Sequence, residues 1–203
     1  MYKFSLLFFL IITLYSKEVT AKHLINDIEY KNNGTYQAFI EIPTGTIDKW
    51  EVNHKTGRLE WEIRDNKPRK VNFLGYVGNY GFIPQTLSGD NDPLDIIVLS
   101  ASVSRGDILS IKVLGMLKLL DNGEEDNKVI AILDNQAPFK DIDTLEEMLV
   151  VYPDVITIVR SWFTSYKTPG KMVFMGYETK QSTIQHIEKA HIKWDTNVQI
   201  NKD

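Results

Sequence analysis

Three aspartates stand within six residues of the sequence, at Asp90, Asp92 and Asp95. Crowded carboxylates repel one another at neutral pH, so either their pKa values rise or a cation binds among them. Asp95 also enters an apolar segment, residues 94–99, where an unpaired carboxylate would be costly to bury. Because hard divalent cations bind carboxylate oxygens, this segment predicts a magnesium, calcium or manganese site.

Two other interpretations of the segment carry less weight. A solvated turn explains an isolated D-x-D pair as well as a metal site does, but it does not explain a carboxylate inside an apolar run. An EF-hand loop does not fit, because its fifth and twelfth positions, counted from Asp90, are Leu94 and Ala101.

A second acidic segment runs over residues 121–128 and contains Asp121 and Asp126. Taken alone, it is typical of a polar hairpin loop with solvated charges. If folding brings the two acidic turns together, their oxygens suffice for several divalent ions. Several ions that clamp one oxyanion are typical of phosphoryl transfer.

Cations and phenols that could bind phosphate oxygens are spread along the chain. Three glycines at residues 75–81 would also let the backbone approach a ligand closely. The candidate phosphate ligands are Lys49, Arg64, Arg69, Lys128 and Lys167, with Tyr76, Tyr80 and Tyr166.

Other catalytic schemes find little support in the sequence. The G-x-S-x-G elbow and the G-x-x-x-x-G-K-[ST] loop are absent, and zero cysteines exclude thiolate chemistry and disulfides. The histidines lack H-E-x-x-H spacing and are expected to be structural: His23, His54, His186 and His191. A formal net charge of -4 with scattered lysines argues against nucleic acid as a partner.

The first residues have the composition of a secretory signal. Lys3 precedes an apolar run over residues 4–15, which is too short to span a bilayer, and cleavage is expected after Ala21. Residues 1–21 are therefore the predicted signal peptide and residues 22–203 a single domain, exported to a periplasm or secreted. No stable membrane association is expected after cleavage; an uncleaved anchor or a buried first helix is the alternative.

The elements that must position these groups change character along the chain. Strand patterns come first and helical spacing comes last, which predicts a β-barrel core flanked by helices in one α+β domain. The first helix is expected to have Asp143 as its N-cap and Glu146 as its capping-box partner. Strands are expected at residues 36–42, 50–53, 59–63, 94–99, 108–118 and 129–133, glycine-rich turns at 75–81, and later helices from Pro153 and over residues 181–194.

The signature D-x-D-P-x-D, formed by Asp90, Asp92, Pro93 and Asp95, resembles that of the soluble family I inorganic pyrophosphatases. The resemblance continues through residues 40–43, 76–86, 119–132 and 161–167. It implies a small five-stranded OB-like β-barrel with helices packed outside, several Mg2+ ions that Mn2+ or other divalent ions can replace, and a homo-oligomer. Most members are cytosolic, so predicted export distinguishes this chain; without signal cleavage the resemblance implies a cytoplasmic protein.

The resemblance also implies a reaction, the hydrolysis of pyrophosphate to two orthophosphates by direct attack of a water shared between two magnesium ions. Asp92 would act on that water as the catalytic residue. Residues 58–74 do not align without a gap, so Arg64 is the expected phosphate-binding arginine and Arg69 the alternative. The implied magnesium ligands are Asp90, Asp95, Asp121 and Asp126; the substrate ligands are Lys49, Arg64, Tyr80, Lys128, Tyr166 and Lys167; and Glu41, Glu51 and Tyr76 lie at the rim, where they can serve an additional ion.

Two other functions remain open from the sequence. One is an exported metal-dependent hydrolase of nucleotides or polyphosphate, for which no base-reading motif is found. The other is a non-catalytic calcium-binding barrel, against which Lys49, Lys128 and Lys167 argue because a structural calcium site has no use for neighbouring cations.

Overall fold

The computed structural model describes residues 22–134 and 138–200. The predicted signal peptide, residues 1–21, lies outside the described residues. Among the helices of the described part, none is both long and apolar enough to cross a membrane.

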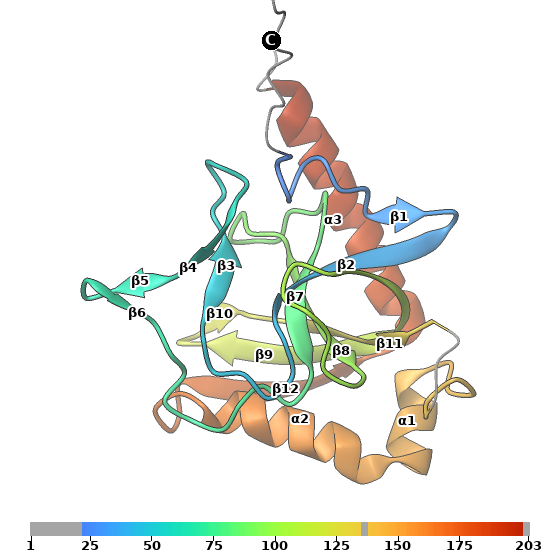
Figure 1. The fold of residues 1–203 in the computed structure, drawn as a ribbon. Helices are drawn as coiled ribbons and strands as arrows, with labels where there is room; N and C mark the ends of the chain where they lie inside the picture. Colours follow the sequence, from blue (N-terminus) through green and yellow to red (C-terminus); the bar gives the residue numbers. More distant parts are fainter. Residues whose placement is uncertain (1–21, 135–137, 201–203) are drawn as a thin grey trace, which may run out of the picture.

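Five strands close into a barrel, as the resemblance implied (Figure 1). Neighbours around the ring pair antiparallel, except for the parallel pair β8–β11, and the pairing of β9 with β2 closes the ring. Full closure removes the exposed edges that an open sheet would present. In ring order the strands are β2 (Thr35–Ile42), β7 (Asn79–Ile83), β8 (Leu94–Leu99), β11 (Lys128–Leu133) and β9 (Ile108–Asp121).

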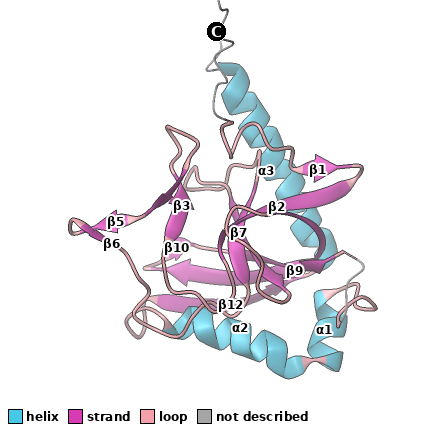
Figure 2. Ribbon diagram, in the orientation of Figure 1, coloured by secondary structure: helices cyan, strands magenta, loops and turns pink. Residues whose placement is uncertain are grey.

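Strand β8 shows why the barrel needs helices on two sides. Its β-branched residues are buried on both faces, and successive side chains point in opposite directions. Ile97 belongs to the core cluster that also contains Trp162 of α2, whereas Ile96 belongs to the cluster that contains Ile187 of α3. Helix α2 (Pro153–Ser165) and helix α3 (Lys180–Ile200) thus cover different parts of the barrel, as Figure 2 shows.

The helices follow the predicted order, with one correction at a cap. Helix α1 spans Leu145–Val151, and Pro153 stands in the first turn of α2 as expected. The N-cap of α1 is Thr144 rather than Asp143, and its capping-box partner is Glu147 rather than Glu146. Both registers satisfy the capping-box pattern, and tertiary structure selects one because Asp143 binds Lys112 at 2.8 Å.

The expected glycine-rich turn at residues 75–81 was wrong in its second half, where β7 forms. A Cβ on Gly81 would lie 1.9 Å from the carbonyl oxygen of Phe39, so this glycine permits the close approach of β2 and β7. Other elements had no sequence prediction, namely β1 (Lys31–Asn32), β10 (Glu124–Glu125) and β12 (Met172–Glu178), and α3 extends beyond the expected end.

A small β-structure stands beside the barrel and carries part of the functional site. The predicted hairpin is confirmed as β3 (Trp50–Val52) paired with β4 (Leu59–Trp61). A second two-stranded ribbon, β5 (Ile63–Arg64) and β6 (Lys67–Pro68), follows at once and projects to the left of the barrel in Figure 1.

Candidate active site

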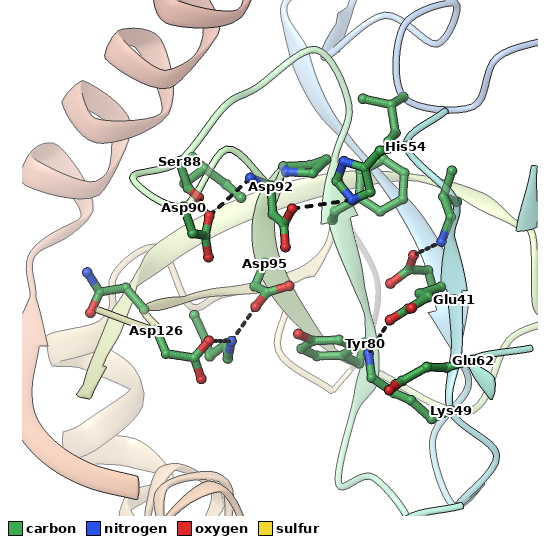
Figure 3. Close-up of a pocket in the computed structure, with 18 of the residues that line it drawn as sticks. Glu41, Lys49, His54, Glu62, Tyr80, Ser88, Asp90, Asp92, Asp95 and Asp126 are labelled. Atoms are coloured by element: carbon green, nitrogen blue, oxygen red, sulfur yellow. Dashed lines mark hydrogen bonds and ion pairs between the residues drawn. The ribbon is translucent and has the colours of Figure 1, made fainter. Parts of the chain in front are cut away.

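A cavity of about 1220 Å³ opens between the barrel and the β3–β4 hairpin, and Figure 3 shows labelled side chains from both sides around it. Ten acidic and five basic side chains line it. Most of the predicted site residues are brought together here: Glu41, Lys49, Glu51, Tyr76, Tyr80, Asp90, Asp92, Asp95, Asp126, Lys128, Tyr166 and Lys167.

The loop before β8 orients two of the aspartates. Asp90 Oδ1 accepts a hydrogen bond from the Asp92 backbone N–H at 3.0 Å and another from the Ser88 hydroxyl. Between the two aspartates, Asn91 adopts a left-handed backbone with φ 71°, which asparagine tolerates better than most residues. This tight turn brings Asp90 and Asp92 to the same cavity.

Asp92 has an exposed side chain, in contrast to Asp95. Its Oδ1 lies 3.4 Å from Nε2 of His54, and its side chain is 64% exposed. Partial burial raises its pKa above the usual range; the charges of Asp90 and Asp95 act in the same direction, whereas His54 opposes them. A carboxylate with a raised pKa beside solvent can accept a proton from water.

Lys128 sits between the two acidic segments. Only 3% of its side chain is exposed, and its ammonium contacts Asp95 and, at 2.7 Å, Asp126. Burial by itself would lower the pKa of Lys128, but the two carboxylates outweigh burial and raise it. The predicted meeting of the two acidic turns therefore occurs, with a buried lysine between them.

Asp121 reaches the cavity only indirectly, through its contact with Lys167. It is outside the lining residues, and its Oδ2 accepts a hydrogen bond at 2.5 Å from Lys167, which does line the cavity. Burial alone would lower the pKa of Lys167, but the bond to Asp121 contributes to a net rise.

Three tyrosines supply phenolic groups to the cavity. Tyr76 and Tyr80 pack with ring centroids 5.2 Å apart, and Tyr166 stacks on Trp162 at 4.7 Å. Burial raises the pKa of Tyr76 and Tyr80 well above the usual range, and Asp95 adds to both shifts. These phenols therefore stay protonated and can donate hydrogen bonds.

The opposite wall carries the predicted rim residues. Glu41 is buried, and its Oε1 accepts a hydrogen bond from the Val52 N–H at 2.7 Å. Burial raises the pKa of Glu41 to about 7, although nearby Lys49 opposes the shift. The ammonium of Lys49 also lies 3.8 Å from the carboxylate of Glu51. This wall of the cavity therefore carries both acidic and basic side chains.

The two candidate arginines lie in different places relative to the cavity. Arg64 is on β5, is 59% exposed and stands outside the cavity lining. Arg69 is 18% exposed and lines the cavity. The ribbon β5–β6 between them causes the difference, because it carries Arg64 outward and returns the chain to the site at Arg69.

Some residues that line or adjoin the cavity were not predicted from the sequence. His54, expected to be structural, lies beside Asp92, and the side chains of Trp61 and Glu62 line the cavity. Alternation correctly placed Trp61 on a strand, but no local signal shows that a hairpin turn will face an aspartate loop. Such proximity is decided only by packing of the hairpin on the barrel.

The carboxylates fit a hard divalent cation by their chemistry. Asp90, Asp92, Asp95 and Asp126 all present oxygens to one cavity, and oxygen is the donor that magnesium prefers. In the described residues, no three acidic or histidine side chains are already gathered around one point. Instead Asp95 and Asp126 pair with Lys128, so this ammonium group would have to change partners when an ion binds.

Known proteins with related sequences share one description. The family model for inorganic pyrophosphatase matches residues 38–195. The mitochondrial inorganic pyrophosphatase of Saccharomyces cerevisiae is 36% identical over 190 residues, which cover 79% of this chain and 61% of the yeast protein. The inorganic pyrophosphatase of Halalkalibacterium halodurans is 33% identical over 161 residues, which cover 78% of this chain and 94% of the bacterial protein.

Solved structures agree with the sequence comparison. Type I inorganic pyrophosphatase from P. falciparum superposes with a TM-score of 0.78 at 29% identity, covering 84% of this chain and 62% of the other. The type I enzyme from Toxoplasma gondii gives 0.79 at 25% identity, covering 84% and 86%. This chain spans less than two thirds of the yeast relative and nearly all of the bacterial one. The chain belongs to the inorganic pyrophosphatase family.

Proposed function

We propose that this protein hydrolyses inorganic pyrophosphate to two orthophosphates with the help of magnesium. The observation that carries the proposal is one cavity in which an acidic wall around Asp90, Asp92 and Asp95 faces cationic side chains from Lys49 and Arg69. With ten acids against five bases, the cavity alone would repel a polyanion, so a substrate of this charge needs divalent cations beside it.

The acidic residues proposed to hold magnesium are Asp90, Asp95, Asp121 and Asp126, with Glu41, Glu51 and Tyr76 at the rim. Magnesium bound there supplies positive charge that lowers the pKa of water and neutralises phosphate oxygens. Manganese prefers the same oxygen donors and should replace it.

Asp92 is proposed as the catalytic base. Its open position and raised pKa support a role in taking the proton of the attacking water. Direct attack of that water on phosphorus breaks the phosphoanhydride bond, so no covalent bond to the protein is required.

The substrate phosphates are proposed to bind Lys49, Tyr80, Lys128, Tyr166 and Lys167, together with Arg69 in place of Arg64. The lysines and the arginine would neutralise charge on the leaving phosphate, and the tyrosines would donate hydrogen bonds to it. Lys128 and Lys167 hold carboxylates in this structure. Each lysine would pair with carboxylates before the ions bind. After the ions bind those carboxylates, the lysine would pair with substrate phosphate.

Phosphate release from pyrophosphate tests this function directly. We expect turnover with Mg2+, none with EDTA, and much slower release from ATP or tripolyphosphate. Comparable rates on ATP or tripolyphosphate would favour the nucleotide or polyphosphate hydrolase instead. Binding of Ca2+ without release from any of the three would favour the non-catalytic barrel.

The setting of the enzyme is also a proposal. Residues 1–21 are proposed as a cleaved export signal on the basis of their composition, and a mature amino terminus at Lys22 would support cleavage. We further propose that the protein is a homo-oligomer, which light scattering of the purified protein checks. No nucleic-acid partner and no stable membrane partner are proposed.

A further inference from the structure

Three residues of the cavity wall are joined by a closed ring of backbone hydrogen bonds. The Lys49 N–H donates to the Arg69 carbonyl at 3.0 Å, and the Arg69 N–H donates to the Glu62 carbonyl at 2.8 Å. The Glu62 N–H completes the ring by donating to the Lys49 carbonyl at 2.9 Å. The backbones of Lys49 and Arg69 are therefore held at one spacing, although the two residues are far apart in sequence.

Trp61 reinforces this ring from its side chain. Its indole Nε1–H donates to the Arg69 carbonyl at 2.8 Å, so this oxygen accepts both Trp61 and Lys49. The Trp61 ring stacks on Trp50 with centroids 5.4 Å apart. The guanidinium of Arg105 lies over Trp50 at 4.6 Å and is itself fixed by the Glu41 carbonyl at 2.9 Å.

Glu62 holds the other end of Arg69. Its Oε2 accepts a hydrogen bond from Arg69 Nη1 at 2.5 Å, and both side chains are largely buried, with 14% and 18% exposed. A guanidinium has five N–H donors, so the contact with Glu62 leaves others for a ligand in the cavity. Charge-assisted pairing also restricts the guanidinium to a narrow set of orientations.

We infer that Trp61 and Glu62 are positioning residues, which set Arg69 and Lys49 at the separation and orientation needed to bind the two ends of a phosphoanhydride. The inference rests on the proposed function and deepens it. Neither residue needs to touch the substrate. Each would restrict the conformations of Arg69 or Lys49, the cations that contact the substrate, and this lowers the entropic cost of binding.

The two stacked tryptophans provide a matched pair of variants. Trp61→Phe keeps a ring on the stack but removes the N–H that holds Arg69. Trp50→Phe makes the same change at a buried N–H that has no hydrogen-bond partner among the described residues. A purely structural role for the stack predicts similar effects for both substitutions.

The first measurement is steady-state hydrolysis of pyrophosphate with saturating Mg2+. We expect Trp61→Phe to raise KM about 3- to 10-fold, the effect of one lost hydrogen bond, with a smaller change in kcat. Trp50→Phe should stay within about 2-fold of the wild type. Equal KM values for the two variants, at equal thermal midpoints, would overturn the role of Trp61.

A double-mutant comparison tests whether the effect passes through Arg69. In an Arg69→Ala background, Glu62→Gln should not raise KM further, because its partner guanidinium is gone. Trp61→Phe should raise KM less than in the natural background, since the carbonyl of residue 69 remains and still binds Lys49. Full additivity of either substitution with Arg69→Ala would overturn its assignment as a positioning residue. Glu62→Asp, which keeps the charge, should recover part of the KM that Glu62→Gln loses.

Calorimetric binding of imidodiphosphate, a pyrophosphate analogue with a nitrogen bridge, separates this inference from the proposed function. A wild type that binds the analogue more tightly than Trp61→Phe but hydrolyses no pyrophosphate would sink the function and retain the positioning role. An active wild type whose variants bind the analogue equally would retain the function and sink the positioning role. Absence of binding to the wild type would count against both.

Discussion

Asp90, Asp92 and Asp95 lie close together in sequence, but the structure surrounds each with different partners. Asp90 closes a turn, Asp92 faces His54 at the mouth of the cavity, and Asp95 contacts the buried ammonium of Lys128. Residue type and spacing predict a metal-binding segment, and this stays a prediction. The separate duties depend on neighbours from β3–β4 and β11, which no local pattern contains.

Asp92→Asn tests the proposed base at this scale. The amide cannot take a proton from water, so kcat should fall by about 10²-fold or more. Because the Asp92 side chain is 64% exposed, folding should be preserved. Phosphate release gives kcat, and circular dichroism checks the fold.

Asp143→Asn is the matched control for this variant. Asp143 is an exposed aspartate that also pairs with a cation, Lys112, but it lies outside the cavity lining. Its substitution should leave kcat unchanged. A fully active Asp92→Asn enzyme would remove Asp92 from the mechanism.

Lys128→Met isolates the lysine between the acidic segments. Without metal, loss of the ammonium leaves Asp95 and Asp126 unpaired in a mostly buried place, so the free energy of unfolding should fall by about 2–3 kcal/mol. Mg2+ should then stabilise the variant more than the wild type, because the ion no longer competes with an ammonium group. Urea denaturation with EDTA and with Mg2+ measures both effects.

The pair Lys118–Glu178, at 3.1 Å, supplies the comparison for that prediction, because its lysine is 39% exposed whereas Lys128 is 3% exposed. Lys118→Met should cost no more than about 1 kcal/mol and should respond to Mg2+ as the wild type does. Equal losses in the two variants would mean that the ion pairs of Lys128 contribute no more to stability than a solvent-accessible pair does.

At the scale of elements, the sequence predicted strands that consist of continuous apolar residues. It did not predict β7, which forms because a glycine lets two backbones approach closely. Residues 94–99 form β8 as predicted, because β-branched residues buried on both faces specify a strand by themselves. Strand β7 was mistaken for a turn because Gly81 suits both, and only the carbonyl of Phe39 shows which applies. The hairpin β3–β4 was predicted, whereas its contact with Arg69 was not.

One carboxylate of helix α3 binds side chains at the start of the first strands. Glu188 accepts hydrogen bonds from Lys31 at 2.5 Å, from Tyr36 at 2.6 Å and from Tyr30 at 3.3 Å. Burial is the main cause that raises the pKa of Tyr36 to about 12, and the bond to Glu188 adds to it. This contact of α3 is therefore sensitive to alkaline pH.

The sign of that sensitivity follows from the raised pKa of Tyr36. Its stabilisation is complete below pH 10, the ordinary pKa, and is lost as the pH rises through about 12. Tyr36→Phe should therefore cost about 1 kcal/mol near pH 9, allowing for partial solvent access, and progressively less as the pH rises toward 12. Urea denaturation across this range measures the difference.

Glu188→Gln provides the background that checks the cause. Without the carboxylate, the cost of Tyr36→Phe should be smaller and should vary less with pH. A cost that stays constant with pH in the natural background would exclude titration of Tyr36 as the source.

At the scale of the whole molecule, the fold concentrates negative charge in one cavity. Ten acidic side chains from loops and strands distant in sequence converge there with five basic ones. Buried apolar clusters hold the barrel and its helices together, whereas the charged side chains gather in this cavity. The folded state therefore carries an electrostatic cost that divalent cations would relieve on binding.

Divalent cations should consequently stabilise the entire fold. At a free Mg2+ concentration about 100 times its dissociation constant, the gain is about 2.7 kcal/mol, which corresponds to a rise of about 5–10 °C in Tm. Differential scanning calorimetry with Mg2+, and again after EDTA, measures it. NaCl at matched ionic strength should give a much smaller shift; an equal shift would reduce the effect to general screening.

The sequence by itself determined the chemical types of the site, the order of the main strands and helices, and the family resemblance, because these depend on local composition and spacing. The five-stranded barrel followed from that resemblance. Only the tertiary structure decided that Arg69, not Arg64, reaches the cavity, that Lys128 lies between Asp95 and Asp126, and that Thr144 caps α1. Each outcome depends on which distant backbone packs beside the residue, and packing is a property of the closed fold rather than of any segment.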